Sequence, residues 1–212
     1  WSSTNTLDYN KTINDVHNIS ALAQMEFQKN KNTFNSSSGY NVAADGLYYV
    51  ASFGTNQSAN GGFSDWKSLS YLGLLNYTYA DKYVADFSYK YEGSSRFAMG
   101  YRFGSFWSAG LAWNIHKENW LEGSNIVNNL KFRASIGQTG SNSVGLNQYQ
   151  SLFSYGGSYD DNGTISPSAF GNQLLSWEKQ TLYDIGLDFT ILDNRITGSV
   201  GYYNKRSNDL LQ

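Results

Sequence analysis

The side chains that most often carry out chemistry are scarce in this chain. It has two histidines, His17 and His116, about a hundred positions apart, and no cysteine. Without cysteine there is neither a disulfide framework nor a thiolate metal site. Two isolated histidines have neither metal-ligand spacing nor the nucleophile-and-base arrangement of a hydrolase. We therefore expect no catalytic residue, no metal ion, no cofactor and no enzyme, and we interpret both histidines as exposed or turn residues.

One acidic stretch, Asp160-Asp161-Asn162-Gly163, resembles a calcium-binding loop. It lacks the full alternation of ligands and the closing Glu of an EF-hand. Asn-Gly after acidic residues is mainly a turn signal. We interpret the stretch as a turn, and a bound cation is the alternative.

Several aromatic residues lie among Asn, Gln, Ser and Gly in stretches without alternation: Tyr48, Tyr49, Trp66, Tyr155 and Tyr159. Rings beside amide and hydroxyl groups can stack on sugars or hold peptides. The alternative is that these rings pack the loops on each other or on a partner protein. We keep Trp66, Tyr155 and Tyr159 as candidate ligand-binding residues.

Composition narrows the class of protein. Of 212 residues, 17% are aromatic, 15% are charged, 21 are Gly and one is Pro. A soluble helical protein would need more charge on its solvated faces, and a membrane-spanning helix needs about 20 mostly apolar residues in a row. The aromatic content argues against disorder, and a net charge of −2 gives no electrostatic case for nucleic acid. These exclusions favour an all-β protein.

Apolar and polar residues alternate with period two, which is typical of strands with two different faces. The alternation covers about eight segments: 6–12, 19–28, 69–79, 82–92, 102–115, 130–137, 183–191 and 195–202. Several are longer than the five or six residues common in soluble proteins. A strand of about 12 residues, tilted by about 40°, rises roughly 30 Å, which is the apolar thickness of a bilayer.

The connections between the segments differ in length. Short turns are expected at Asn14-Asp15, Asp81-Lys82 and Asp193-Asn194, with a somewhat longer link at 116–127, and long loops at roughly 30–65, 93–100 and 140–175. Outer-membrane barrels have short periplasmic turns and long extracellular loops. We therefore predict this orientation, with a soluble lipocalin-like barrel or sandwich as the alternative.

Energetics predicts which face meets lipid. In lipid every backbone group must be paired internally, so strands span only as a closed barrel, and Arg or Lys on the lipid face at the bilayer midplane would cost about 2–4 kcal/mol. The residues expected to face lipid are Tyr71, Leu75, Tyr83, Phe87, Tyr89, Trp107, Leu111, Trp113, Phe132, Ile185, Leu187 and Phe189. The residues expected to face the lumen are Asp86, Lys90, Lys131, Arg133, Asp184 and Asp188. Tyr and Trp near the strand ends suit the membrane interface.

Three blocks of sequence carry a family resemblance and together span roughly residues 66–212. The first is residues 83–97, which ends in Gly93-Ser94-Ser95-Arg96-Phe97. The second joins residues 107–115 to 130–140, and the third runs from Leu175-Ser176-Trp177-Glu178 to Asp209-Leu210-Leu211. In order and spacing the blocks resemble the SusC/RagA-like TonB-dependent transporters. The sequence departs from the family pattern at Tyr91-Glu92 and in a short loop after Phe97.

The resemblance implies that residues 1–212 are about eight strands of a 22-stranded transmembrane antiparallel β-barrel. It also implies an N-terminal plug outside these residues, through which TonB supplies energy, and a SusD-like surface lipoprotein that acts as a lid. The implied function is import of an oligosaccharide or peptide across the bacterial outer membrane. The chain starts at Trp1-Ser2-Ser3 and stops at Gln212, so we expect a piece of a longer protein. The alternative is a complete eight-stranded barrel with a structural or adhesion role.

Overall fold

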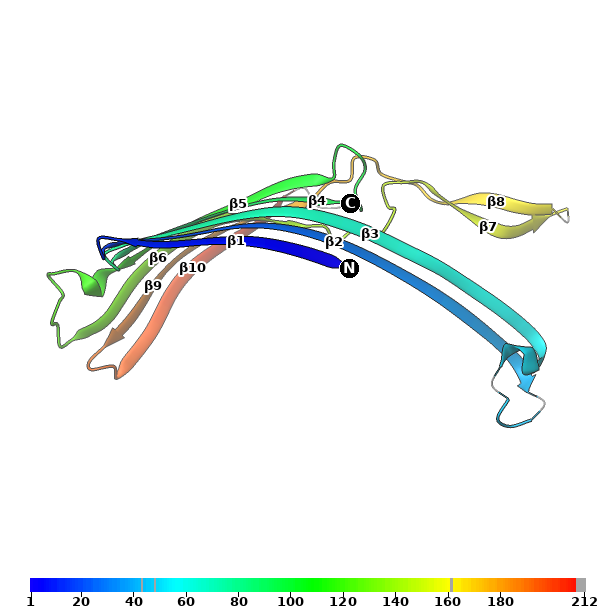
Figure 1. Ribbon diagram of the computed structural model, residues 1–212, viewed down its shortest axis with the longest axis horizontal. Coiled ribbons are helices and arrows are strands. Elements are labelled where there is room, and N and C mark those ends of the chain that lie inside the picture. Colours follow the sequence, from blue (N-terminus) through cyan, green and yellow to red (C-terminus); the bar gives the residue numbers. More distant parts are fainter. Residues whose placement is uncertain (43, 48, 161, 209–212) are drawn as a thin grey trace.

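The computed structural model describes residues 1–42, 44–47, 49–160 and 162–208, and it is built from β-strands and two single-turn 3₁₀ segments (Figure 1). The strands are β1 (Ser2–Ile13), β2 (His17–Val42), β3 (Phe53–Tyr79), β4 (Tyr83–Ser94), β5 (Phe103–Asn114), β6 (Val127–Ser141), β7 (Leu152–Tyr159), β8 (Asn162–Ala169), β9 (Glu178–Ile191) and β10 (Ile196–Asn208). The 3₁₀ segments are η1 (Val50–Ser52) and η2 (Ile115–Lys117).

Eight strands form one antiparallel sheet in the order β1-β2-β3-β4-β5-β6-β9-β10. Each strand pairs with its neighbour in the chain, except where the separate β7–β8 hairpin is inserted between β6 and β9. The sheet is curved but open (Figure 1), and β1 and β10 lie at its two edges. The alternative of eight strands that close on themselves is therefore wrong for the described residues.

Tight turns join the strands at one end of the sheet. The central residues Asn14 and Asp15 of the β1–β2 turn have φ of 51° and 54°, and Ala80 and Asp81 of the β3–β4 turn have φ of 51° and 55°. Two-residue turns with positive φ at both positions match the twist of paired strands. The short turns expected from the sequence are thus confirmed.

Two of the expected long loops are in fact strands. Residues 30–65 are mostly the outer halves of β2 and β3, which have 26 and 27 residues, and residues 152–159 and 162–169 are the paired strands β7 and β8. The prediction was wrong there because these strands contain Asn, Ser and Gly in place of alternating apolar residues, and backbone pairing with a neighbour keeps them extended. The two hairpins project from the sheet (Figure 1).

A small apolar core holds the longest connections against the sheet. It consists of Phe97, Phe106, Val144, Leu175 and Trp177. The Trp177 indole lies 5.3 Å from the Phe97 ring and 5.2 Å from the Phe106 ring, and its N–H donates to the Arg102 carbonyl at 2.9 Å. The core therefore ties the connections after β4 and before β9 to strand β5.

We predict that Gly140→Ala destabilises this core, because the added Cβ would lie 2.0 Å from the Phe106 ring. Overpacking of this kind costs about 1–3 kcal/mol, which should appear as a lower unfolding temperature of the full-length protein in detergent. Gly73→Ala is the matched control, since nothing lies within 4 Å of its Cβ. Equal unfolding temperatures for the two variants would contradict the packing described here.

Candidate functional site

The functional surfaces of this chain are the two faces of its sheet. Register places cross-strand partners on the same face, so Ala85, Leu111, Ala134 and Ile185 form one row across four strands. All twelve residues expected to face lipid lie on this face, and all but the half-buried Phe189 are exposed. The sheet thus presents a broad apolar surface that nothing in the described chain covers.

An aromatic row crosses the apolar face beside the tight turns. The Tyr79 ring lies 5.0 Å from His17 and 6.3 Å from Tyr83, and the Tyr83 ring lies 6.3 Å from Trp113. His17 also shares a hydrogen bond of 2.7 Å with the Tyr77 hydroxyl. Rings with polar atoms in a row at the strand ends are typical of a membrane interface.

The opposite face carries the charged residues. Arg133 on β6 pairs with Asp184 on β9, and its Nε lies 3.5 Å from an Asp188 carboxylate oxygen. The guanidinium lies over Gly186, where an added Cβ would be 2.6 Å from the Arg133 Cζ. Because residue 186 is glycine, the Arg133 guanidinium has room to contact the carboxylates of both Asp184 and Asp188.

The same face continues as a polar ladder across β3, β4 and β5. The Asn76 amide donates to Asp86, and the Ser88 and Ser108 hydroxyls share a hydrogen bond of 2.6 Å. Lys90 pairs with Glu92. Lys131 is the register partner of Asp188, so all six residues expected to face the lumen share one face. Much of the charge on this face is therefore paired with charged or polar side chains of the same face.

A hollow of about 360 Å³ opens on the polar face between Lys90, Glu92, Phe106 and Thr139. Phe106 forms one wall and also belongs to the small core. Phe106 was not predicted from the sequence, although its position next to Trp107 was a signal. Two adjacent aromatic residues in a strand must point to opposite faces.

A second feature that the sequence analysis did not identify is a network around Glu118, just after η2. Its carboxylate accepts from the Tyr83 hydroxyl at 2.6 Å and the Trp113 indole at 3.0 Å, and it pairs with Lys82 at 3.2 Å. The hydrogen bond from Tyr83, followed by that from Trp113, lowers the pKa of Glu118. The network fixes the link between β5 and β6 to the aromatic row.

The candidate ligand-binding residues lie on strands, not on loops as expected. Trp66 is half-buried in β3, with the Arg96 guanidinium 5.1 Å from its ring. Tyr155 and Tyr159 lie on β7 and expose 89% and 79% of their surfaces. The structure therefore brings the two tyrosines onto one hairpin and places Trp66 apart from them.

Among the described residues, the remaining candidates do not come together in a catalytic or metal-binding arrangement. His17 begins β2, and His116 lies in η2 with its ring 3.3 Å from the Leu130 carbonyl. Asp160 precedes β8, while Tyr48 and Asp161 lie outside the described residues. Within the described ranges, no three His, Cys, Asp or Glu side chains are grouped to hold a metal ion. No helix in those ranges is long and apolar enough to span a membrane.

We predict that Glu118→Gln weakens the structure near neutral pH and matters less in acid. Because the folded-state pKa of Glu118 is lowered, its contribution is complete above the ordinary value of 4.5 and is lost as the pH falls through the folded-state pKa. Unfolding temperatures of the full-length protein should therefore differ between wild type and variant at about pH 7 and converge in acid, once the pH lies below the lowered folded-state pKa.

Glu122→Gln is the matched control, because Glu122 lies in the same link and its side chain is exposed. It should unfold like wild type at both pH values. A difference between wild type and Glu118→Gln that stays constant from neutral pH to acid would contradict the assigned role of the carboxylate.

Comparison with known proteins identifies relatives of this two-faced sheet. The TonB dependent receptor-like β-barrel family model matches residues 1–212. The TonB-dependent receptor P3 of Formosa agariphila is 33% identical over 222 residues, which covers 99% of this chain and 21% of the relative. The TonB-dependent receptor SusC of Bacteroides thetaiotaomicron is 37% identical over 153 residues, which covers 68% of this chain and 15% of the relative.

A solved structure of the RagAB peptide transporter superimposes with a TM-score of 0.90 and 28% identity, over 99% of this chain and 24% of that one. A second structure, of the RagAB peptide importer in its open-open state, gives a TM-score of 0.86. The chain thus spans about a quarter or less of the relatives it matches. Those relatives are named receptors and transporters, and their family consists of outer-membrane β-barrels. The apolar face, the polar face and these matches together show that the chain belongs to the TonB-dependent receptor β-barrel family and forms part of a larger barrel.

Proposed function

We propose that the protein containing this chain imports a large nutrient, an oligosaccharide or a peptide, across the outer membrane with energy from TonB. The observation that carries the proposal is the superposition of nearly the whole chain on the RagAB peptide transporter, at a TM-score of 0.90. The identity of 37% to SusC supports the same class of transporter. Uptake measurements with labelled oligosaccharides and peptides distinguish the two substrate classes.

In this proposal the apolar face meets lipid and the polar face lines the lumen. The exposure of Leu75, Phe87, Leu111 and Ile185 supports the first assignment, because such a surface would be unfavourable in water. The Arg133 cluster supports the second, because three charged side chains would be costly against lipid. A lumen whose charged side chains are already paired offers a large hydrophilic solute many weak contacts and no single site that binds it tightly.

The orientation we propose places the tight turns in the periplasm and the long hairpins outside the cell. The support is the difference in length between the two ends: two-residue turns at one end, and the β2–β3 and β7–β8 hairpins at the other (Figure 1). Outer-membrane barrels have this asymmetry. The aromatic row at His17, Tyr79, Tyr83 and Trp113 then marks the periplasmic interface.

We further propose that a SusD-like lipoprotein covers the outer end and contacts the β7–β8 hairpin. The large exposed side chains of that hairpin and its flanks support this, because water-exposed rings on a projecting hairpin are typical of an interaction surface. Those assigned to the lipoprotein are Phe153, Ile165 and Phe170. TonB would act through a plug that this chain does not include.

Tyr155 and Tyr159 remain the proposed ligand contacts, because their rings are exposed and free to stack. Trp66 is a weaker candidate, since Arg96 lies over its ring and donates to the Val144 carbonyl at 2.9 Å. These contacts give Trp66 and Arg96 a role in holding the connection after β6. The hollow beside Phe106 is the second place where substrate would meet the polar face.

We predict that cells expressing the full-length protein take up labelled oligosaccharides or peptides only when TonB is present. Tyr155→Ala/Tyr159→Ala should raise the apparent KM about five- to 160-fold, because two aromatic stacks are lost and each is worth about 0.5–1.5 kcal/mol. Tyr40→Ala is the matched control, since Tyr40 is also an exposed tyrosine and lies on the other hairpin. Uptake that continues at the same rate without TonB would contradict the proposed function.

A further inference from the structure

A cluster of three lysines with one acidic residue among them lies on the apolar face at the point where the face becomes polar. Lys29 on β2 and Lys67 on β3 are direct register partners, so their ammonium groups share one face, and like charges in this position are destabilising. Both side chains are exposed. Lys31 follows on the next row, where its ammonium lies 6.0 Å from the Phe63 ring.

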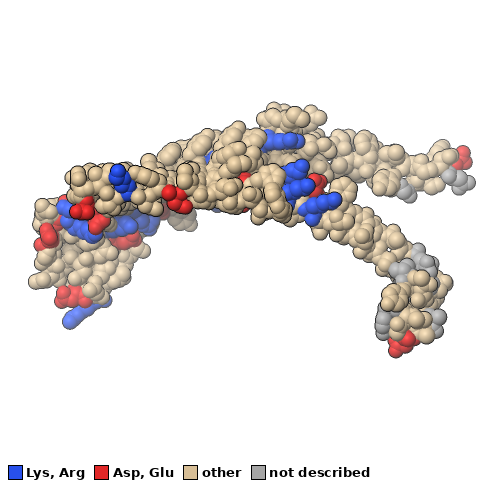
Figure 2. Space-filling view, viewed as in Figure 1, with Lys and Arg blue, Asp and Glu red and all other residues tan. Residues whose placement is uncertain are grey.

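Acidic groups near the cluster do not balance it. Asp65 is the register partner of Lys31 and is the acid closest in sequence on this face. No ion pair within the described ranges includes Lys29, Lys31 or Lys67. Three lysines and one aspartate leave an excess of positive charge, and basic side chains gather where the β2–β3 ribbon leaves the main sheet (Figure 2).

The depth of this cluster matches a membrane interface. Tyr79, in the aromatic row at the turns, and Lys67 are about twelve positions apart on β3, which corresponds to roughly 30 Å along the membrane normal for a tilted strand. That is the thickness of the hydrocarbon layer. If the aromatic row lies at the inner interface, Lys29 and Lys67 lie at the level of the outer headgroups.

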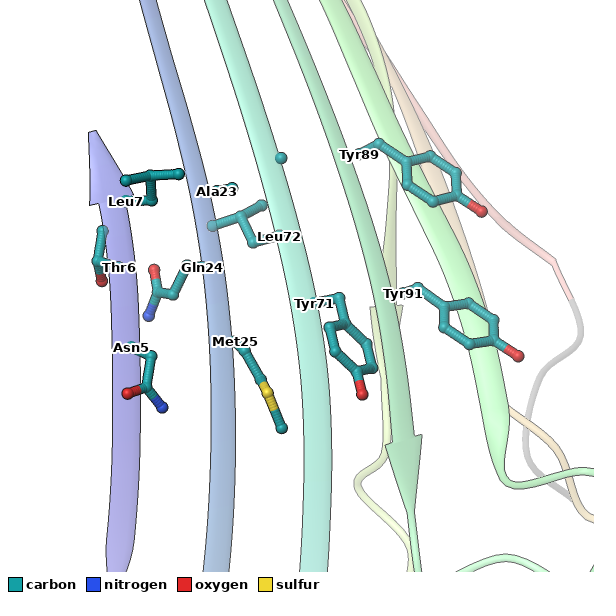
Figure 3. A pocket seen from close by; sticks show the side chains of 11 residues that line it. Asn5, Thr6, Leu7, Ala23, Gln24, Met25, Tyr71, Leu72, Tyr89 and Tyr91 are labelled. Atoms are coloured by element: carbon teal, nitrogen blue, oxygen red, sulfur yellow. The ribbon is translucent and has the colours of Figure 1, made fainter. Parts of the chain in front are cut away.

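An apolar hollow of about 430 Å³ lies on the same strands, between the lysines and the tight turns. Its floor is Ala23 and Gly73, which are register partners, and no side chain fills the space over Gly73. Leu7, Met25, Tyr71, Tyr89 and Tyr91 stand around it (Figure 3). Phe27 and Leu69 form the row between the hollow and the lysines, so a continuous apolar track runs from one to the other.

A second hollow on the same face provides a contrast. It has about 350 Å³ and lies between Tyr77, Ala85 and Leu111 near the turns. Lys82, which precedes Tyr83 in the wall of this hollow, already pairs with Glu118 at 3.2 Å and donates to Asn119 at 3.0 Å. Hollows therefore occur at both depths, but a cluster of lysines with excess positive charge accompanies the upper one.

We propose that this region binds a phosphate-bearing lipid of the outer leaflet, with its phosphate at Lys29 and Lys67 and an acyl chain in the hollow over Ala23 and Gly73. The phosphate would relieve the repulsion between the paired lysines, and the chain would cover apolar surface that the sheet leaves open. The inference rests on the proposed function for the outward orientation of the apolar face. The lipid is an annular partner and is distinct from the imported nutrient.

The test is a lipid titration of the purified full-length protein in detergent, followed by native mass spectrometry. The probes are monophosphorylated lipid A, the same lipid without its phosphate, and inorganic phosphate alone. Wild type should bind the phosphorylated lipid most tightly. Lys29→Gln/Lys67→Gln should weaken that binding roughly ten- to thirtyfold, and Gly73→Leu, which fills the hollow, should weaken it about tenfold or more.

Two matched controls lie at the turn end of the same face: Lys11→Gln and Ala85→Leu, the second of which fills the lower hollow. Both should bind like wild type. Equal affinity for the lipid without phosphate, an unchanged affinity in the double lysine variant, or equal binding of inorganic phosphate alone would overturn the proposal. A change in the number of protein copies in place of lipid binding would also overturn it, because a second copy would then cover the hollow.

Uptake measured on the same variants separates the two proposals. A wild-type protein that imports the nutrient and binds no phosphorylated lipid overturns the lipid site and leaves the proposed function intact. Lipid binding by a wild-type protein that imports nothing overturns the proposed function and leaves the lipid site intact.

Discussion

The constraint on which the whole structure depends is that backbone N–H and C=O groups in lipid must bond to each other. The chain meets it with an uninterrupted antiparallel ladder, in which eight strands pair in the order β1-β2-β3-β4-β5-β6-β9-β10. The register of that ladder then determines which side chains lie on each face, because a shift by one residue would exchange the two faces. Within the described residues β1 and β10 are the edge strands of this sheet, and the rest of a larger barrel would continue from their outer edges.

Given this ladder, side-chain chemistry separates by face. Aromatic and aliphatic residues cover one side, and small or charged residues cover the other, where Arg133 joins Asp184 and Asp188. Glycine makes the second arrangement possible at Gly186, under the guanidinium, and at Gly140, under the Phe106 ring. The high aromatic and glycine content and the low charge of the chain are therefore consequences of a sheet that separates two environments.

Much of this could be predicted from the sequence, since period-two alternation reports the pleat directly. The alternating segments, the short turns and the sharing of a face by Asp86, Arg133 and Asp188 all followed from it. The outer halves of β2 and β3 and the β7–β8 hairpin could not be predicted in the same way, because a strand without one buried face has no alternating pattern. The Glu118 network and the Phe106 core also escaped prediction, since both depend on contacts between side chains distant in the sequence, such as Trp177 with Phe106.

The central claim is that odd-numbered residues of β5 face lipid and even-numbered ones face the lumen. Residues 1–212 contain no cysteine. After replacement of any cysteine elsewhere in the full-length protein, single cysteines can be placed at each of 107–112, spin-labelled in lipid bilayers, and probed with oxygen and a water-soluble relaxation agent. The account predicts oxygen accessibility that peaks at 107, 109 and 111, and water accessibility that peaks at 108, 110 and 112. Uniform access to water along the strand, or the opposite alternation, would contradict it.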